Sequence, residues 1–186
     1  RWNSTLQEIV DRLHNGEYGV LRAASIYYQK GILNNGSHAI DMMRWFFGEP
    51  ANTAFTGTAF DDEKDPGLDF VLTFNNGAKA VFTNIPGCNY HLFEIDLLLD
   101  KSRISIKQRG QYTQEYSVTP EPYYKTFNIV TETGPLMESA WKYCMKGAID
   151  ELAMTVLGDG KVSCNMMDGF RANELCLDII DEYRRS

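Results

Sequence analysis

The feature that most constrains this chain is a pair of apolar, β-rich runs separated by a turn. LDFVLTF (68–74) is followed by Asn75-Asn76-Gly77 and then by AKAVFTNI (78–85). Asparagine and glycine tolerate the positive φ angles that tight turns between strands require. Residues 68–85 are therefore predicted to form a β-hairpin, and the remaining elements must be compatible with a sheet built around it.

Further strands are predicted on both sides of this hairpin. Residues 18–29 (YGVLRAASIYYQ) are rich in β-branched, aromatic and small residues, a composition typical of strands. Residues 93–100 alternate between apolar and mainly polar side chains, which is the period of a strand with one face in the core. Shorter strands are expected near 103–108 and 112–118. The middle of the chain thus predicts a mostly antiparallel sheet.

Helical periodicity occurs at both ends of the chain. A first helix is expected behind Ser4, with Gln7 completing a capping-box pattern and Asn15-Gly16 as a stop. Residues 37–47 (SHAIDMMRWFF) predict a helix buried on most faces, ended by Gly48. Two more helices are expected near the C-terminus, one from Met137 to Val156 and one after Asn165 with its apolar stripe at Ala172, Leu175, Cys176, Ile179, Ile180 and Tyr183.

Strands in the middle with helices at both ends indicate an α+β fold. The expected sheet is open, and an uncovered sheet face that is partly apolar would be a natural surface for homo-oligomerisation. The 186 residues suit a single domain, since one core usually holds about 100 to 200 residues.

The bulk properties exclude several classes of partner. The net charge is −7 and the longest basic run is Arg184-Arg185, so nucleic acid is not expected. No apolar run reaches the length of about 18 residues that a membrane span needs, and the start lacks the apolar core of a signal peptide. We therefore expect a cytoplasmic protein without a membrane partner.

The cysteines and the other familiar motifs point to no metal or hydrolytic chemistry. Four scattered cysteines without CxxC spacing predict reduced thiols. Cys88-x-x-His91 has the spacing of half a zinc site, but no second pair accompanies it. No phosphate-binding glycine loop occurs, Ser37 is not in a G-x-S-x-G motif, and the acidic run at 61–65 is typical of a solvated loop.

The candidate chemistry lies in KGILNNGSHAID (30–41), where a strand gives way to a helix. His38 is either a packed histidine near a helix start or a group that exchanges a proton with a ligand near neutral pH. Asp41 shares a helix face with His38; it either orients the imidazole or stabilises its surroundings, and the second role is favoured. Lys30 could reach the same pocket. Tyr27 and Tyr28 point to opposite sides of the strand, and the sequence does not tell which one enters the core.

The stretch KGILNNGSHAIDMMRWFFGEP (30–50) resembles the start of the C-terminal domain of the Gfo/Idh/MocA oxidoreductase family. That family shows roughly G-x-x-x-D-x-G-x-H-x-x-D followed by an apolar helix and Gly-Glu. LQEIVDRLHNGEYGVLRAASI (6–26), FNNGAKAVFT (74–83) and the final 27 residues from Gly160 resemble other parts of the same domain. The resemblance spans nearly the whole chain.

The resemblance implies a sheet of the glyceraldehyde-3-phosphate dehydrogenase C-terminal type, with helices on one face. It also implies that residues 1–186 are the substrate and oligomerisation domain of an NAD- or NADP-dependent dehydrogenase of sugars, nucleotide sugars or polyols. An NAD(P)-binding Rossmann domain of about 120 residues, with a Glu-Lys-Pro motif whose lysine is catalytic, would precede Arg1. We expect no tight cofactor binding and no dehydrogenase activity from this chain alone.

Carried over by position, His38 matches the family's active-site histidine, and Asn34 takes the place where many members have aspartate. An aspartate would favour the protonated imidazole, whereas the neutral Asn34 can only fix a tautomer by hydrogen bonding. His38 and Asn34 are therefore the expected catalytic pair, with Lys30, Asn35 and Asp41 as substrate-binding residues and no metal. The alternative is a non-catalytic sugar-binding or scaffold module that keeps the fold.

Overall fold

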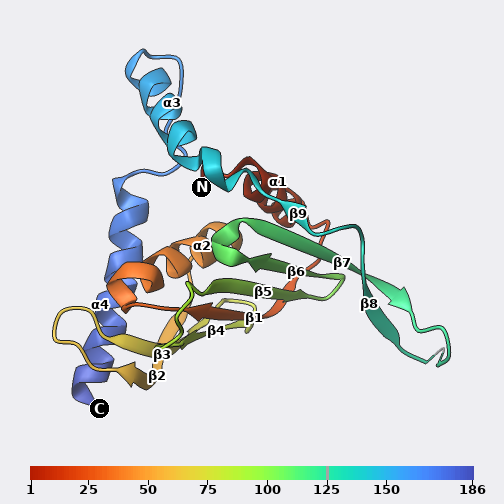
Figure 1. The fold of residues 1–186 in the computed structure, drawn as a ribbon, viewed down its shortest axis with the longest axis horizontal. Helices are drawn as coiled ribbons and strands as arrows, with labels where there is room; N and C mark the ends of the chain where they lie inside the picture. Colours follow the sequence, from red (N-terminus) through yellow and green to blue (C-terminus); the bar gives the residue numbers. More distant parts are fainter. Residues whose placement is uncertain (125) are drawn as a thin grey trace.

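The computed structural model describes residues 1–124 and 126–186 and has a large open sheet as its centre (Figure 1). Within these residues the sheet has nine strands in the order β2-β3-β4-β1-β5-β6-β7-β8, with β9 paired to β7. The strands are β1 (Leu21–Tyr28), β2 (Asn52–Phe60), β3 (Gly67–Thr73), β4 (Lys79–Asn84), β5 (Phe93–Leu99), β6 (Ser102–Lys107), β7 (Tyr112–Pro120), β8 (Asn128–Glu132) and β9 (Met137–Glu138).

Every strand pairing in this sheet is antiparallel except that between β1 and β4, which is parallel with Ile26 opposite Phe82. The parallel pair arises because a helix follows β1, and the chain returns through β2 and β3 before it forms β4. The prediction of an open, mostly antiparallel sheet is confirmed. So is the hairpin, in which β3 pairs with β4 across Asn75-Asn76-Gly77.

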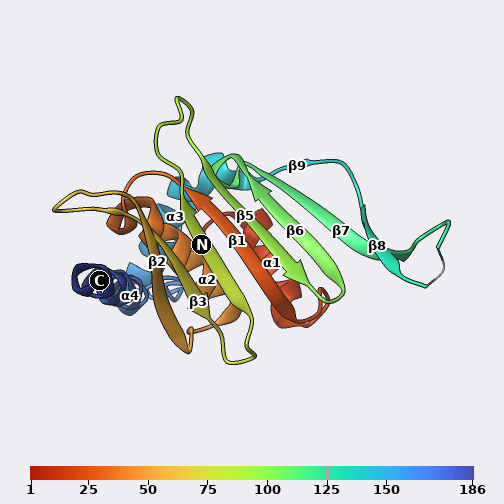
Figure 2. The same cartoon turned by 90° about the horizontal axis from the view of Figure 1, so that it is seen from below.

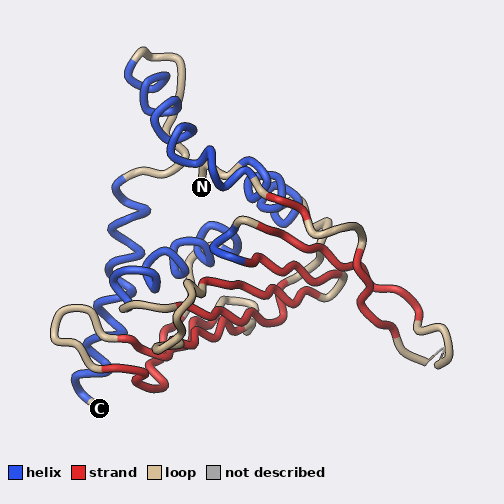
Figure 3. The backbone as a smooth tube through the Cα atoms, in the orientation of Figure 1, coloured by secondary structure: helices blue, strands red, loops and turns tan. Residues whose placement is uncertain are grey.

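The helices lie on one side of the sheet, and the other side is uncovered (Figures 1 and 2). Figure 3 shows the strands as one continuous layer below α1 and α2, with α4 running across the edge at β2. The helices are α1 (Ser4–His14), the π-helical turn η1 (Ile32–Gly36), α2 (Ser37–Phe47), the 3₁₀ turns η2 (Gln108–Gly110) and η3 (Ala140–Tyr143), α3 (Cys144–Val156) and α4 (Met166–Arg185). None of the helices within the described ranges has both the length and the apolar character needed to cross a membrane.

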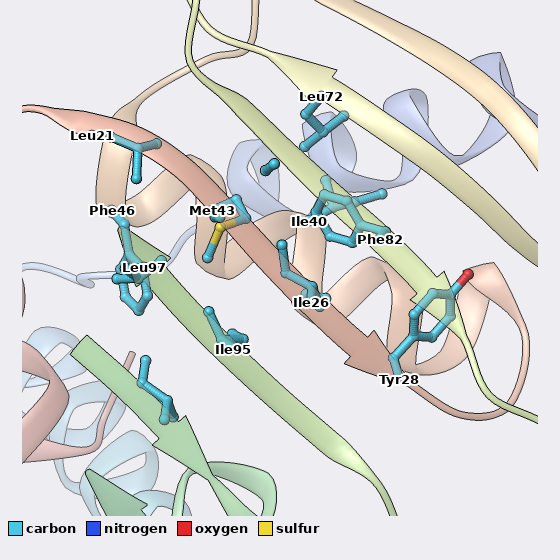
Figure 4. Close-up of a cluster of buried hydrophobic side chains, with 14 of the residues drawn as sticks. Leu21, Ile26, Tyr28, Ile40, Met43, Phe46, Leu72, Phe82, Ile95 and Leu97 are labelled. Atoms are coloured by element: carbon cyan, nitrogen blue, oxygen red, sulfur yellow. The ribbon is translucent and has the colours of Figure 1, made fainter. Parts of the chain in front are cut away.

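The core lies between α2 and the centre of the sheet (Figure 4). Ile40 and Met43 of α2 are completely buried, as are Ile26 of β1 and Phe82 of β4. Phe70 stacks on Phe82 with ring centroids 4.2 Å apart. Full burial stabilises each such side chain by about 1.5 to 3 kcal/mol, so this layer fixes the position of α2 and of the turn that precedes it.

The alternation in the strands is confirmed by their burial. In β5, Phe93, Ile95, Leu97 and Leu99 face the helices. Tyr28 is buried in the core, while Tyr27 lies on the uncovered face and is 43% exposed, which settles the question that the sequence left open.

Three details of the expected helices and strands are wrong. The N-cap of α1 is Asn3, not Ser4, because the Asn3 side chain accepts hydrogen bonds from the Thr5 and Leu6 amides. The first strand is shorter than 18–29, since Gly19 has a φ of +84° and cannot continue it. Met137 lies in β9 and not in a helix, because its segment pairs with β7.

Two further differences concern elements near the edges of the fold. The sequence reasoning missed β2 and β8, which lie at the two ends of the strand order. The helix α3 does form, but none of its residues is buried, and it projects from the body of the molecule beside the N-terminus (Figure 1). The apolar spacing of this segment therefore predicts a helix correctly, but the apolar side chains of α3 are not buried within this chain.

Candidate functional site

His38 lies where β1 ends and α2 begins, a turn that several specific contacts hold in place. Lys30 has a φ of +62°, and its carbonyl accepts a hydrogen bond of 2.5 Å from the buried Asn84 side chain. The Leu33 amide donates to a carboxylate oxygen of Asp65 at 2.7 Å. These contacts, together with the packing of α2, fix the position of His38, which is itself exposed.

The two glycines of this turn are required by packing. A Cβ on Gly31 would lie 2.0 Å from the Asp65 side chain, and one on Gly36 would lie 3.3 Å from the Tyr28 ring. The space that glycine leaves is thus filled by protein atoms. A dinucleotide phosphate needs a glycine-lined cradle that is open to the ligand, so this turn does not fit NAD(P).

The backbone amides of the turn are also engaged. Ile32 donates to Pro66, Asn34 donates to Gly31, and Gly36 donates to Gly31 through the π-helical turn. These N–H groups at the start of α2 are therefore not free to bind a ligand, because η1 continues directly into α2 and uses them as donors. Side chains remain as the groups available for binding.

Next to this turn lies a cavity of about 560 Å³. This volume is in the range of small-molecule sites. Of the expected site residues, Asn35, His38 and Asp41 line it. Lys30 and Asn34 are both exposed and are not among the lining residues described. The other lining residues are Arg1, Trp2, Asn3, Leu6, Met42, His91, Phe93, Arg109, Gly110, Trp141, Cys144 and Cys164.

Asn35 presents an unsatisfied amide at this cavity. The residue is only 8% exposed, and its Nδ2 atom is buried without a hydrogen-bond partner among the described residues. Buried polar groups in proteins are nearly always paired with protein, water or ligand. A bound molecule could satisfy this amide, and the role of Asn35 in substrate binding stays a prediction.

The carboxylate of Asp41 is already occupied. It accepts hydrogen bonds from Arg1 Nε at 3.0 Å and Arg1 Nη2 at 2.6 Å, and Arg44 Nη1 lies 3.4 Å away. Arg44 in turn donates to Glu49, a contact that lowers the pKa of the Glu49 carboxyl. The favoured structural interpretation of Asp41 agrees with these contacts.

Sequence reasoning missed three residues that line the same cavity, namely His91, Arg109 and Trp141. The Arg109 guanidinium lies over the Trp141 ring, 5.2 Å from its centroid. Burial lowers the pKa of His91, and the charges of Arg109 and Lys30 lower it further. No local sequence signal marks these three residues, because chain folding brings them together from distant positions.

No metal centre is found in the part of the chain that the structure describes. It contains no group of three or more His, Cys, Asp or Glu side chains that could hold a metal ion. The Cys88-x-x-His91 spacing therefore belongs to no such group among the described residues, and His91 lines the cavity described above.

Residues 23–105 match the family model described as the GFO/IDH/MocA C-terminal domain. The matched segment begins in β1, contains the turn with His38 and all of α2, and ends within β6. The resemblance inferred from the sequence is confirmed over this segment. A comparison with curated proteins finds no match.

Solved oxidoreductases have the same fold. A myo-inositol dehydrogenase from Corynebacterium glutamicum is 18% identical, with a TM-score of 0.69 over 98% of this chain and 60% of that one. Levoglucosan dehydrogenase in complex with NADH and L-sorbose is 14% identical, with a TM-score of 0.69 over 95% and 60%. A UDP-N-acetylglucosamine 3-dehydrogenase from Acidithiobacillus ferrooxidans is 13% identical, with a TM-score of 0.66 over 92% and 56%. This chain thus spans about three fifths of the length of these structures.

Proposed function

We propose that this chain is the substrate-binding and oligomerisation domain of an NAD(P)-dependent oxidoreductase that acts on a secondary alcohol or ketone of a sugar, nucleotide sugar or polyol. The main support is the cavity at the end of β1, where His38, Asn35, His91 and Arg109 come together. The fold supports it as well, since similar structures are dehydrogenases of inositol, levoglucosan and a nucleotide sugar.

In this proposal His38 forms a hydrogen bond with a substrate hydroxyl and relays its proton, and Asn34, one turn earlier, fixes the imidazole tautomer. The amide of Asn35 binds a second hydroxyl, which would satisfy its unpaired Nδ2 atom. Lys30 contributes positive charge near the cavity. Asp41 acts indirectly by positioning Arg1 and α2.

The dinucleotide would be held by residues outside this chain. The space beside Gly31 and Gly36 in the β1–α2 turn is occupied by Asp65 and Tyr28 and is not open to a phosphate. When bound, NAD(P) supplies or accepts the hydride. The described residues would bind and orient the sugar and move a proton at its hydroxyl. The resemblance implies that the principal acid or base is a lysine of the preceding domain.

The test is substrate turnover by the complete protein with NAD(H) or NADP(H) and a panel of sugars and polyols. His38→Ala should lower kcat by about 100-fold, the order expected for loss of a general acid or base, while leaving NAD(H) affinity unchanged. His14→Ala is the matched control, because His14 is an exposed histidine in the last turn of α1. Equal activity of His38→Ala and the wild type would overturn the assigned role.

Two further expectations belong to this proposal. Residues 1–186 alone should neither reduce NAD(P) nor give a calorimetric binding signal with NADH, and a clear titration would contradict this. The complete protein is expected in the cytoplasm. If no sugar or polyol is turned over and the preceding sequence lacks a glycine-rich βαβ unit, the non-catalytic binding or scaffold module becomes the better description.

The uncovered face of the sheet is the proposed surface for homo-oligomerisation. Tyr27, Val81 and Leu98 lie on this face in neighbouring strands and are each 42–43% exposed. Val81 pairs with Ser25, Leu98 with Ala23 and Tyr27 with Thr83, so the three exposed apolar side chains run diagonally across the open face among small and polar neighbours. Exposed apolar side chains on an open sheet are typical of protein interfaces. Figure 2 shows this side of the strands without any helix in front of it.

A further inference from the structure

We propose that Arg109 and His91 form a subsite for an anionic group of the substrate, a carboxylate or a phosphate, beside the hydroxyl that faces His38. This inference rests on the proposed function, because it concerns the same cavity. The inference goes beyond the proposed function because it assigns a charge to the substrate and names residues outside the β1–α2 turn.

The geometry of Arg109 is the first support. Arg109 lines the same cavity as His38 and lies in the turn η2 between β6 and β7. Gln108, Arg109 and Gly110 all have positive φ angles, of 48°, 63° and 81°. A non-glycine residue in this region is uncommon and costs free energy unless its surroundings hold it there. The turn therefore presents the Arg109 side chain in a defined direction.

The stacking of Arg109 on Trp141 further orients it. Its guanidinium centre lies 5.2 Å from the Trp141 ring centroid, a distance at which a cation is attracted to the aromatic face. An arginine that stacks by its plane keeps the N–H groups at its edge, where they can bind a carboxylate or phosphate with two hydrogen bonds. Trp141 also lines the cavity.

Arg109 differs from most arginines of this chain because it has no acidic partner within the described residues. Ion pairs with carboxylates are formed by Arg1, Arg12, Arg22, Arg44, Arg103 and Arg171. Such pairing is expected in a chain with a net charge of −7. An arginine left unpaired at a cavity in an acidic protein is available to a ligand.

The neighbours of Arg109 are also basic. Arg109 and Lys30 are the two charges that affect His91, and both lower its pKa. The acid on the cavity wall, Asp41, is bound by Arg1 and Arg44. Two basic side chains, His91 and Arg109, thus lie on this part of the cavity wall from separate segments. Lys30 does not line the cavity, but its charge acts on His91 as that of Arg109 does, and a bound anion would be attracted by these positive charges.

The test compares neutral and anionic substrates with the same sugar ring on the complete protein, using glucose, glucuronate and glucose 6-phosphate with the preferred cofactor. The expected result is a kcat/KM at least about tenfold higher for one of the two anions, the size of one charge-assisted hydrogen-bond pair. The two anions separate a carboxylate subsite from a phosphate subsite. A preference for neutral glucose would overturn the proposal.

The variant Arg109→Gln should raise KM for the preferred anion by about ten- to a hundredfold and leave KM for glucose nearly unchanged. Arg184→Gln, which changes an exposed arginine at the end of α4, should change neither value. If Arg109→Gln does not fold, Arg109→Lys keeps the charge but loses the double hydrogen bond, and an intermediate KM is expected. An unchanged anion preference in the folded variants would show that Arg109 only packs on Trp141.

A direct binding measurement separates failure of this inference from failure of the proposed function. Calorimetry with glucuronate and with inorganic phosphate should detect binding that weakens with added salt and in Arg109→Gln. Anion binding without any turnover would keep the subsite and reject the dehydrogenase. Turnover of sugars without anion preference or anion binding would keep the dehydrogenase and reject the subsite.

Discussion

The guanidinium of Arg1 binds the carboxylate of Asp41 through two hydrogen bonds, from Nε to Oδ2 at 3.0 Å and from Nη2 to Oδ1 at 2.6 Å. The two side chains are only 10% and 23% exposed. Paired charged hydrogen bonds of this kind are among the strongest in proteins. They connect the first residue of the chain to α2, and they leave Asp41 engaged with Arg1 and not with His38.

Asp41→Asn should lower the free energy of unfolding by about 1 to 3 kcal/mol, because it removes the negative charge opposite a largely buried arginine. Urea unfolding followed by circular dichroism measures the change. Asp178→Asn is the control, since Asp178 is exposed on α4, and it should change stability by less than about 0.5 kcal/mol. Equal effects of the two substitutions would contradict a structural role for the Arg1–Asp41 pair.

Tyr28→Phe should destabilise the fold by about 1 to 2 kcal/mol. The Tyr28 hydroxyl is fully buried and donates a hydrogen bond of 2.5 Å to the Leu68 carbonyl in β3, and the substitution leaves that acceptor without its partner. Tyr27→Phe removes a hydroxyl from the neighbouring residue on the uncovered face and should be nearly neutral in the monomer. Thermal unfolding of the two variants side by side tests the assignment of Tyr28 to the core.

Cys176 should be the last cysteine to react with iodoacetamide at pH 8. Burial raises its pKa from the ordinary 9.0 to about 12, so the reactive thiolate is scarce in the folded state. The half-buried Cys88 is the comparison within the same molecule. Mass spectrometry after timed labelling would contradict the prediction if Cys176 were modified as fast as Cys88.

The same raised pKa predicts a loss of stability in alkali. Below pH 9 the Cys176 thiol is protonated in both the folded and the unfolded states, so its ionisation does not lower the free energy of unfolding there. As the pH rises from about 9 toward 12, only the unfolded state ionises this group, and stability falls. Cys176→Ala should therefore flatten part of the decline measured by urea unfolding across this pH range.

Leu98→Glu should prevent self-association if the uncovered sheet face is the oligomer interface. It places a charge on the uncovered face that also carries Tyr27 and Val81, where burial in an interface would be costly. Leu177→Glu is the matched control, because Leu177 is a similarly exposed leucine on α4. Light scattering coupled to gel filtration should give the monomer mass for Leu98→Glu alone, and unchanged masses for both variants would reject this interface.

The strands and helices with a strong local pattern were predicted correctly. The period of two in 93–100 and the Asn75-Asn76-Gly77 turn identify β5 and the β3–β4 hairpin, because half-buried strands and tight turns leave direct marks in a sequence. The strands β2 and β8 have no comparable alternation, since they lie toward the ends of the sheet and bury less. Met137 was misplaced because its pairing with β7 depends on a distant segment.

The β1–α2 turn was found from the sequence because its residues are contiguous, and three of them line one cavity. His91, Arg109 and Trp141 were missed for the opposite reason. They lie far apart in three loops or turns and acquire a common role only when β5, β6 and η3 bring them to the same cavity. No local pattern distinguishes Arg109 from a solvated arginine.

The sequence by itself determined the α+β class, the central hairpin and the place of His38 at a strand-to-helix turn, because backbone propensity and side-chain periodicity are local properties. The tertiary structure alone decided that Tyr28 and not Tyr27 enters the core, that Asp41 is bound by Arg1, and that Arg109 stacks on Trp141 beside His91. These outcomes depend on which distant side chains share a small volume, and only the packed fold sets those distances.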